Sequence, residues 1–403
     1  MRRRRMRWPN HPVREHAARE CTRMSLPPLS AADDVAMMRL ALAMARRGLG
    51  RSWPNPAVGA VVWMPTAEGP RVIARALTAA GGRPHAETEA LRLAGPAARG
   101  AVMSVTLEPC SHHGKTPPCA EALVKAGLSR VVSALEDPDP RVAGRGHALL
   151  RQAGLEVVVG VEARAAFLSH IGHIRRVTRH RPAVLLKLAR TQDGYAAGDA
   201  GTRLQITGPI GSARVHIERA EADAIMVGIG TVLADDPQLT CRLSGLQARS
   251  PIRVVLDTQA RLPLTSMLVK TARLVPVWVI VGEGADPARV AALVAHGVEV
   301  ITVAQRQADD AMHLDLEQAL QALGQRGITR VMSEGGPHVA DALARAGLVD
   351  EVTLITHQAP LGRQGLRAVG PHLQQLITDK TQFEALPHAR YGEDVIEHFV
   401  RVD

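Results

Sequence analysis

The chain has 403 residues, of which 46% are hydrophobic and 22% are charged, a composition typical of a folded protein with room for two or three domains. Aromatic residues make up only 2%, which argues against a binder of single-stranded nucleic acid, because such proteins stack bases on aromatic rings. Four cysteines are too few for a small disulfide-rich secreted domain. With neither a bilayer-spanning apolar run nor the apolar core of an export signal, we expect a cytoplasmic protein without a membrane partner.

The positive charge gathers at the N-terminus. Residues 1–24 hold eight arginines against two glutamates, so +6 of the chain's net charge of +10 lies there. Like-charged segments without apolar periodicity rarely pack, and we therefore expect residues 1–30 to form a basic, disordered extension. An arm that binds RNA or another anionic surface is the alternative.

Strands and helices alternate over residues 31–165. Ser30 and two aspartates open an apolar-periodic segment that ends at Gly48, which predicts a helix of roughly 15 residues. A turn and a strand follow, and Pro65 is expected to end that strand. Further helices are predicted over 85–93, 118–126 and 145–154, and further strands over 101–109, 129–135 and 155–161. This alternation predicts a mostly parallel sheet covered by helices on both faces.

A basic, helix-like linker over residues 166–182 precedes a second round of alternation. Residues 183–403 are therefore expected to form a second α/β domain, which a strand over 394–403 closes. The apolar segments that mark its other strands are 183–189, 222–237, 252–257, 276–282, 297–303, 330–336 and 350–356.

A candidate metal site lies in the first domain. The stretch "PHAETEAL" places His85 and Glu87 two residues apart at a predicted helix start. After the next strand, "EPCSHHGKTPPC" supplies Cys110 and Cys119. Catalytic zinc takes three protein ligands and leaves a fourth position open. The histidine and the two cysteines fit that role, and Glu87 would carry a proton to a leaving amine, as in zinc deaminases.

The spacing of the cysteines departs from the short pattern of other zinc deaminases. They lie nine positions apart, whereas Pro-Cys-x-x-Cys places them about three apart. A looped-out spacer would still bring both sulfurs to the metal, with Cys119 at a helix start where the dipole favours a thiolate. In that loop, His112, His113 and Lys115 are candidates to meet an anionic group. Two alternatives stay open: the cysteines are plain buried thiols, or His112 and His113 replace His85 as ligands.

Two glycine-containing stretches of the second domain are candidates for a nucleotide site. "GIGTVL", which begins at Gly228, lacks the third glycine of the dinucleotide-binding fingerprint. "SEGGPHVADAL" fits better, because Gly335 and Gly336 lie between a strand and a helix whose free N–H groups suit a phosphate. Such turns are also common without any ligand.

Several motifs, taken in chain order, resemble one enzyme family. "PNPAVGAVV", "PHAETEAL", "TLEPCSHHGKTPPC" and "EDPDPRVAGRG" resemble the deaminase half of the bifunctional riboflavin-biosynthesis deaminase/reductases, in which a long spacer separates the cysteines. "LKLARTQDGYAA", "IMVGIGTVLADDPQLTCR" and "SEGGPHVADALARAGLVDEV" are similar to the reductase half. The likeness covers about residues 31–401. It implies an α/β protein, with a cytidine-deaminase-like three-layer α/β/α domain followed by a dihydrofolate-reductase-like α/β domain.

The resemblance also implies two consecutive reactions. Zn²⁺ serves the hydrolytic deamination of 2,5-diamino-6-(5-phosphoribosylamino)pyrimidin-4-one. NADPH then serves the reduction of the ribosyl group to ribityl. The implied partners are this small molecule and further copies of the chain, as a homodimer or homotetramer, and no nucleic acid.

Residue roles follow from the resemblance position by position. It implies zinc ligands at His85, Cys110 and Cys119, and a proton shuttle at Glu87. The implied cofactor contacts are Ala189, Gln205, Thr231, Asp235, Thr258, Gly336, Pro337, His338, Val339, Ala340, Asp341 and Ala342. The implied substrate contacts are Asn55, Lys187, Arg203, Arg219, Leu239, Arg242 and Glu334. Arginines suit the substrate because guanidinium groups pair bidentately with phosphate.

The chain departs from the family's pattern at four positions. "RLQIT" stands where "SxWIT" is usual, so that Arg203 replaces serine and Gln205 replaces tryptophan. Trp53 and Thr78 stand where histidines are often found. The alternatives are therefore a deaminase whose reductase half is impaired or altered, and a zinc-stabilised protein that binds RNA through its basic N-terminal arm.

Overall fold

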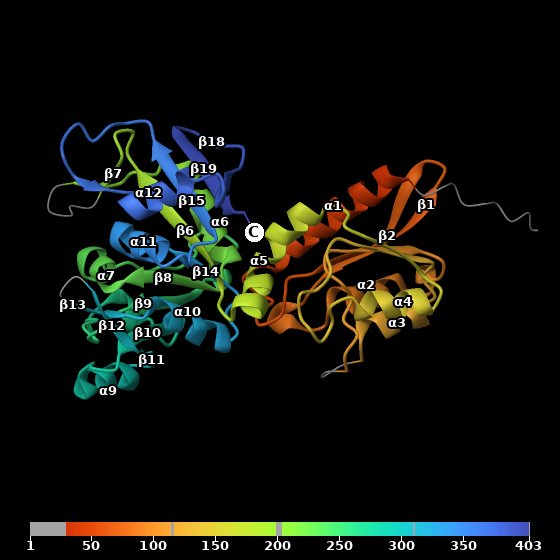
Figure 1. Cartoon of the computed structure of the whole chain (residues 1–403), viewed down its shortest axis with the longest axis horizontal. Helices are drawn as coiled ribbons and strands as arrows, with labels where there is room; N and C mark the ends of the chain where they lie inside the picture. The colour runs from red at the N-terminus through yellow and green to blue at the C-terminus, as the bar shows by residue number, and fades with distance from the viewer. Residues whose placement is uncertain (1–29, 114–116, 199–203, 309–310, 403) are drawn as a thin grey trace, which may run out of the picture.

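The computed structural model describes residues 30–113, 117–198, 204–308 and 311–402. Residues 1–29 of the predicted extension, Lys115 and Arg203 lie outside these ranges. The described chain forms two α/β halves side by side, with the helix α5 (Ala163–Arg179) between them (Figure 1). None of the helices in these ranges combines the length and the hydropathy that crossing a bilayer requires.

The first half is built on one sheet. Within the described residues, its five strands take the order β2-β1-β3-β4-β5. Their bounds are β1 (Gly59–Thr66), β2 (Gly69–Leu77), β3 (Val102–Val105), β4 (Arg130–Ser133) and β5 (Glu156–Val159). β3, β4 and β5 are parallel, whereas β1 runs antiparallel to both β2 and β3. The prediction of a mostly parallel sheet is wrong at this edge, because a tight hairpin rather than a crossover helix joins β1 to β2.

The β1–β2 hairpin differs from expectation in two further ways. β1 continues through Pro65, which was expected to end it, and β2 was not predicted. Beyond Trp63, β1 pairs with β2 alone, so the missing N–H of Pro65 breaks no ladder with β3. β2 is an edge strand, and its alternation of exposed and buried residues is weak.

Helices cover both faces of the first sheet (Figure 1). The remaining helices of this half are α1 (Ala31–Gly48), α2 (Ala86–Ala94), α3 (Cys119–Ala126) and α4 (Arg145–Gln152), with short 3₁₀ turns η1 (Ala80–Gly82) and η2 (Gly95–Ala98). Alternate residues of β1 serve the two cores, as the two-residue period of a strand requires. Val61 and Trp63 pack in the cluster that includes α1 and α5. Ala60 and Val62 pack in the cluster that includes α2, α3 and α4.

In the part of the chain that the structure describes, the second half holds a ten-stranded sheet. Its order is β11-β10-β9-β8-β14-β6-β15-β19-β17, and β18 also pairs with β19. The strands from β11 to β15 are parallel, and β19 is antiparallel to β15. Their bounds are β6 (Ala183–Arg190), β8 (Ala224–Gly228), β9 (Ile252–Leu256), β10 (Val277–Gly282), β11 (Glu299–Val303), β14 (Arg330–Ser333), β15 (Glu351–His357), β17 (Phe383–Ala385), β18 (Ala389–Tyr391) and β19 (Asp394–Arg401).

Helices and two small ladders complete the second half. The helices are α6 (Pro209–Glu221), α7 (Ile229–Asp235), α8 (Met267–Lys270), α9 (Pro287–Ala295), α10 (Leu316–Gln325), α11 (Gly336–Arg345) and α12 (Pro371–Thr378), with a 3₁₀ turn η4 (Gln247–Arg249). The ladders pair β12 (Gln305–Ala308) with β13 (Ala311–Leu314), and β7 (Tyr195–Ala197) with β16 (Leu366–Arg367). Two apolar clusters flank the sheet: Val254 and Ile280 belong to one, Val255 and Val279 to the other.

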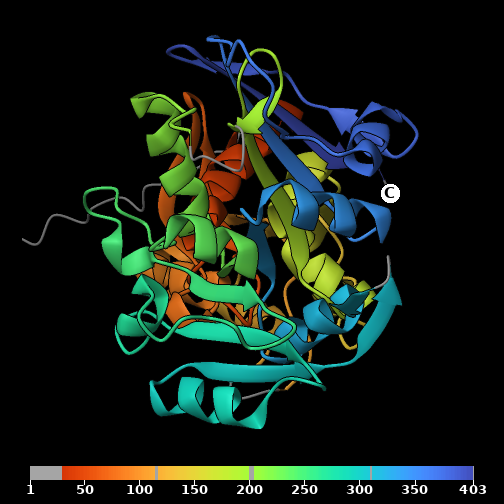
Figure 2. The same cartoon turned by 90° about the vertical axis from the view of Figure 1, so that its left-hand side faces the viewer.

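The helix α5 packs against both halves. His170 Nε2 lies 2.9 Å from the Thr106 hydroxyl in the first half, and Arg175 Nε lies 2.7 Å from Asp350 in the second. A Cβ atom at Gly172 would lie 2.8 Å from the carbonyl oxygen of Thr329, so this position requires glycine for the close approach of the two backbones. In Figure 2, which looks onto the second half, the first half lies behind this junction. Most of residues 166–182, expected as a linker, are therefore a packed helix.

Candidate active site

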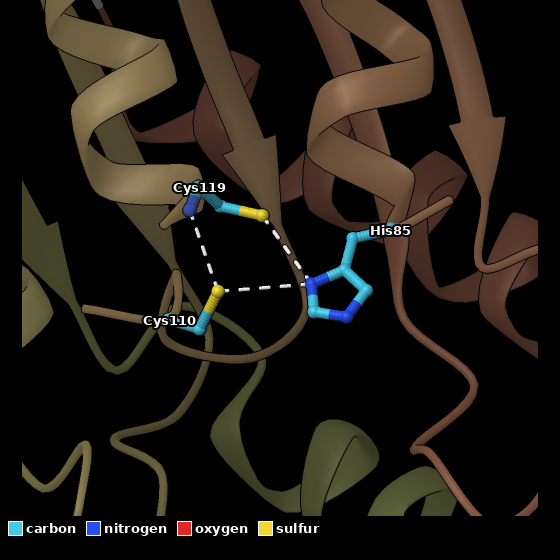
Figure 3. Close-up of side chains that lie close together, drawn as sticks. All are labelled: His85, Cys110 and Cys119. Atoms are coloured by element: carbon cyan, nitrogen blue, oxygen red, sulfur yellow. Dashed lines mark hydrogen bonds between the residues drawn. The ribbon is translucent and has the colours of Figure 1, made fainter. Parts of the chain in front are cut away.

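His85, Cys110 and Cys119 converge although they are far apart in the sequence. His85 is the residue just before α2, Cys110 follows β3, and Cys119 is the first residue of α3. The His85 Nδ1 atom lies 3.7 Å from Cys110 Sγ and 3.4 Å from Cys119 Sγ (Figure 3). Tetrahedral zinc with ordinary bond lengths separates a nitrogen ligand from a sulfur ligand by about 3.6 Å. The donor set and its spacing therefore fit zinc.

Of the three side chains, Cys110 is the one that loses its proton most readily. The Cys119 backbone N–H donates to Cys110 Sγ at 3.3 Å. The pKa of the Cys110 thiol is lowered to about 4, chiefly because the Cys119 thiol hydrogen-bonds to it; burial opposes this, and His85 adds to it. The same hydrogen bond raises the pKa of Cys119, and Cys110 likewise raises the pKa of His85. Cys110 thus carries the negative charge that a thiolate ligand needs.

Glu87 lies beside this triad, on the first turn of α2, and its side chain is buried. Burial and, after it, the negative charge of Cys110 raise the pKa of Glu87 to about 7, against the opposing effect of His85. A carboxyl group that titrates near neutrality can both accept and release a proton during one reaction. A proton shuttle, the role predicted for Glu87, requires a carboxyl group of this kind.

A cavity of about 370 Å³ reaches two members of the triad, His85 and Cys110. His85, Glu87, Cys110 and the predicted substrate residue Asn55 line it, and the Asn55 amide donates to the Gly82 carbonyl oxygen at 2.8 Å. A Cβ atom at Gly82 would lie 2.6 Å from that amide. The glycine therefore allows Asn55 to sit against the backbone at the cavity wall.

The structure separates the alternatives for the ligand set. His112 also lines the cavity, but His85 is the histidine that groups with the two cysteines among the described residues. His113 is exposed and lies 3.1 Å from Glu121. Both cysteines are free thiols. The reading in which His112 and His113 replace His85 is therefore wrong in this arrangement.

Several residues that line this cavity were not predicted. The loop after β4 contributes Asp139 and Arg141, α5 contributes Arg176, and His180 follows directly after α5. No motif marks the last two, because α5 reads as a basic linker and reaches the cavity only through the packing of the two halves. Thr78, which stands in place of a histidine, is buried and its hydroxyl accepts from the Val58 N–H at 2.9 Å, so it supports the wall rather than a ligand.

A second cavity, of about 670 Å³, lies at the carboxyl ends of parallel strands in the second half. The ends of parallel strands are the usual place for ligands in open α/β sheets. Five predicted cofactor residues line the cavity: Thr258, His338, Val339, Asp341 and Ala342. They come from the segment after β9 and from α11.

The turn between β14 and α11 leaves open space beside a helix start. Gly336, the first residue of α11, has a φ of 77°, which favours glycine, and a Cβ atom there would meet only the Thr231 hydroxyl, at 3.6 Å. Glycine at position 335 is favoured for a different reason, because a Cβ atom there would lie 3.0 Å from the Val339 side chain. Helix starts with free backbone N–H groups are common phosphate sites, and residues of α11 also line the cavity of about 670 Å³.

The remaining predicted cofactor residues are not wall residues of this cavity. Asp235 ends α7, and Pro337 and Ala340 belong to α11. Ala189 lies on β6 and packs against an apolar cluster, whereas the Gln205 amide donates to the Thr207 carbonyl oxygen at 3.3 Å.

Glu334 and Arg219, both predicted to hold the substrate, bind each other. Arg219 Nε and Nη2 donate to the two Glu334 carboxylate oxygens at 2.7 and 2.9 Å, and Nη1 donates to the Thr240 carbonyl oxygen at 3.0 Å. Burial opposes ionisation of Glu334, but Arg219 and Lys187 outweigh it and lower its pKa to about 2. Leu239 is buried with a φ of 54°, and the Arg242 N–H donates to His216 Nδ1 at 3.3 Å.

Known proteins match both halves of the chain. The family described as the RibD C-terminal domain matches residues 182–396, and the cytidine and deoxycytidylate deaminase zinc-binding region matches residues 31–135. The riboflavin biosynthesis protein RibD of Escherichia coli is 37% identical over 378 residues, which cover 90% of this chain and 98% of that protein. Its counterpart in Bacillus amyloliquefaciens is 38% identical, over 78% of this chain and 82% of that protein.

Solved structures agree with the sequence comparison. One form of Acinetobacter baumannii RibD has a TM-score of 0.78 and 33% identity, and covers 93% of this chain and all of that one (100%). A Thermotoga maritima protein described as a diaminohydroxyphosphoribosylaminopyrimidine deaminase/5-amino-6-(5-phosphoribosylamino)uracil reductase has a TM-score of 0.77 and 32% identity, over 92% of this chain and 99% of that one.

A three-layer α/β/α half with a His-Cys-Cys triad, joined to a mostly parallel sheet with a glycine turn, defines a two-domain enzyme that pairs a zinc deaminase with a nucleotide-dependent reductase. The two halves are cytidine-deaminase-like and dihydrofolate-reductase-like, as predicted. The chain belongs to the RibD family of bifunctional riboflavin-biosynthesis enzymes. It is a deaminase and a reductase that uses Zn²⁺ and NADPH, which confirms the predicted pair of activities and cofactors.

Proposed function

We propose that His85, Cys110 and Cys119 hold the zinc ion of the deaminase. The observation that carries this is the approach of one imidazole nitrogen to two sulfurs, at 3.7 and 3.4 Å, beside a buried carboxyl group. A zinc ion in this place supplies the Lewis acidity that makes water a nucleophile near neutral pH. The substrate is 2,5-diamino-6-(5-phosphoribosylamino)pyrimidin-4-one, and water attacks the ring carbon that bears the 2-amino group.

Glu87 moves the protons of this reaction. It takes one proton from the attacking water as the carbon–oxygen bond forms, and delivers it to the amino nitrogen as the carbon–nitrogen bond breaks and ammonia leaves. Its pKa of about 7 supports both steps, because neither protonation state is strongly favoured at working pH. Asn55, fixed by its bond to Gly82, orients the pyrimidine ring at the cavity wall.

The second half reduces the ribosyl group of the deaminated product. NADPH supplies the hydride when it is bound. The start of α11 at Gly336 holds a cofactor phosphate, and Thr231 and Thr258 border the same region. The ionised pair of Glu334 and Arg219 fixes the edge of the substrate site beside Lys187. Leu239 and Arg242 follow α7 and complete this site in our proposal.

The same proposal places the enzyme in the cytoplasm as a homodimer or homotetramer that binds no nucleic acid. The free thiols of Cys110, Cys119 and Cys241 suit a reducing compartment. The oligomer and the missing affinity for nucleic acid rest on the resemblance to the family. Molar mass in solution tests the first, and an RNA titration with and without residues 1–24 tests the second.

One assay tests both catalytic assignments. Purified full-length protein is given the diaminopyrimidine substrate with and without NADPH, and ammonia release and nicotinamide absorbance are followed separately. We expect ammonia without NADPH, and NADPH oxidation only after deamination. In Glu87→Ala, ammonia release stops while reduction of pre-deaminated substrate continues. A Glu87→Ala protein that still releases ammonia at the wild-type rate excludes the shuttle role.

A further inference from the structure

The wall of the deaminase cavity carries a cation whose partner is missing. Arg176, on α5, lines the cavity together with His85, Cys110 and Glu87. Its Nη2 donates to the Pro54 carbonyl oxygen at 2.9 Å, while its Nε is buried without a hydrogen-bond partner among the described residues. In those same residues, no carboxylate forms an ion pair with Arg176. A buried donor of this kind is costly unless something pairs with it.

The acidic residues near Arg176 are already engaged by other donors. Asp139 binds the side chain of Arg141, and Asp137 accepts from His173 at 3.0 Å. Glu108 accepts three backbone N–H groups, those of residues 137, 144 and 147. The negative charge that Arg176 lacks is therefore not supplied by the cavity wall.

Other groups at the cavity also favour an anion. Arg141 faces the cavity and is close enough to Arg176 that the repulsion between the two guanidinium groups adds to burial in lowering the pKa of Arg176. His112 Nδ1 is likewise buried without a partner among the described residues. Arg141 is already paired with Asp139, so Arg176 is the guanidinium group at this cavity wall that has no carboxylate partner among the described residues. Guanidinium groups bind phosphate well, because they match its oxygens with two parallel hydrogen bonds.

The placement of Arg176 is fixed from both halves of the protein. Three residues before it on α5, His173 binds Asp137 of the deaminase loop at 3.0 Å. Directly before it, Arg175 binds Asp350 of the second half at 2.7 Å. Because both contacts are buried, this turn of α5 has little freedom, and Arg176 is held at the cavity before any ligand arrives.

We propose that Arg176, on the helix that joins the two halves, binds the 5′-phosphate of the deaminase substrate. This rests on the proposed function, because that substrate brings a phosphate monoester to a cavity whose reactive end is the zinc triad. The phosphate pairs with the part of the Arg176 guanidinium group that faces the cavity, and the carbonyl of Pro54 keeps the guanidinium plane in position. The second half of the chain thereby takes part in deamination, since it anchors the helix that carries this arginine.

The test compares a phosphorylated and a dephosphorylated substrate in the full-length, zinc-loaded protein. In Arg176→Gln, we expect KM for deamination of the phosphorylated substrate to rise about 10- to 100-fold, the loss typical of one charged hydrogen bond. For the dephosphorylated ribosylaminopyrimidine, KM stays unchanged. The kcat changes little for either substrate. Arg179→Gln, an exposed arginine one turn further along α5, is the matched control and behaves as wild type.

Two further measurements separate a phosphate contact from a structural role. Inorganic phosphate inhibits the wild-type deaminase competitively, and Arg176→Gln weakens that inhibition by the same factor as KM. Arg176→Lys keeps the charge but not the planar fork, so its loss is smaller and is again confined to the phosphorylated substrate. If Arg176→Gln does not fold, Arg176→Lys provides the same comparison between the two substrates.

The outcomes are distinct. An equal rise of KM for both substrates, or an unchanged KM for the phosphorylated one, overturns the assignment of Arg176 and leaves the deaminase function standing. Failure of the wild-type protein to release ammonia from either substrate overturns the proposed function itself.

Discussion

Arg175 and Asp350 tie the two halves of the enzyme together through a buried ion pair. The Nε atom of Arg175 lies 2.7 Å from one oxygen of the Asp350 carboxylate, which is fully buried. Arg181 and the Val184 N–H donate to the other oxygen at 2.6 and 2.9 Å. One carboxylate thus fixes the end of α5 and the start of β6 at once.

Removal of Asp350 is expected to destabilise the protein strongly. Asp350→Ala removes the shared carboxylate partner of two buried guanidinium groups, and breaking a buried pair in this way costs about 3–5 kcal/mol. Glu384→Ala is the control, because its pair with Arg164 also joins the halves but both side chains are half exposed, and such pairs contribute at most about 1 kcal/mol. Urea denaturation of both variants checks the difference. Equal, small losses would show that the junction does not depend on this carboxylate.

His170 is expected to make the junction sensitive to acid. Burial, followed by the charge of His173, lowers its pKa to about 3 from an ordinary value of 6.5. Below pH 6.5 His170 binds a proton in the unfolded chain but stays neutral in the folded chain. The free energy of unfolding therefore falls as the pH drops toward 3. By pH 5 this amounts to about 2 kcal/mol for one such group.

The matching variant is His170→Gln, whose amide can keep the bond to Thr106 but does not titrate. We expect its free energy of unfolding to vary less between pH 7 and pH 5 than that of the wild type, by about 2 kcal/mol. Denaturant titrations at several pH values check this. Parallel pH profiles for the two proteins would contradict the buried, neutral state of His170.

Alanine substitutions at Gly336 and Gly347 form a matched pair that tests the proposed cofactor site at the turn before α11. Both have a positive φ, 77° and 69°, at opposite ends of α11, and both have room for a Cβ atom. Alanine at either position costs about 1–2 kcal/mol of backbone strain. Only Gly336→Ala is expected to weaken NADPH binding, measured by the fluorescence of the bound nicotinamide, since Gly336 alone borders the proposed phosphate site. If both variants bind NADPH as the wild type does, the phosphate site lies elsewhere.

Much of the first site could be predicted because its chemistry is local in the sequence. His85 and Glu87 belong to one helix start, and each cysteine follows a recognisable strand or begins a helix. The alternation of strand-like and helix-like segments in the sequence likewise predicted most of the helices and strands. The hairpin of β1 and β2 was missed because its edge strand has only weak alternation and because Pro65 was read as a stop signal.

The parts that escaped prediction depend on tertiary packing. Arg176 reaches the deaminase cavity only because α5 is clamped between the two halves. Arg219 and Glu334 are 115 positions apart and neutralise each other, which no local pattern reveals. Arg203 lies outside the described residues, so the consequence of its replacement of serine stays a prediction.

Zinc content of single variants tests the central claim most directly. Full-length wild type, Glu87→Gln and Cys241→Ala, a buried cysteine of the second half, are expected to retain stoichiometric zinc after dialysis. His85→Ala, Cys110→Ala and Cys119→Ala are expected to lose it, because each removes one of three ligands. Retention of zinc by the three ligand variants, or its loss from Glu87→Gln, would contradict the assignment of these side chains.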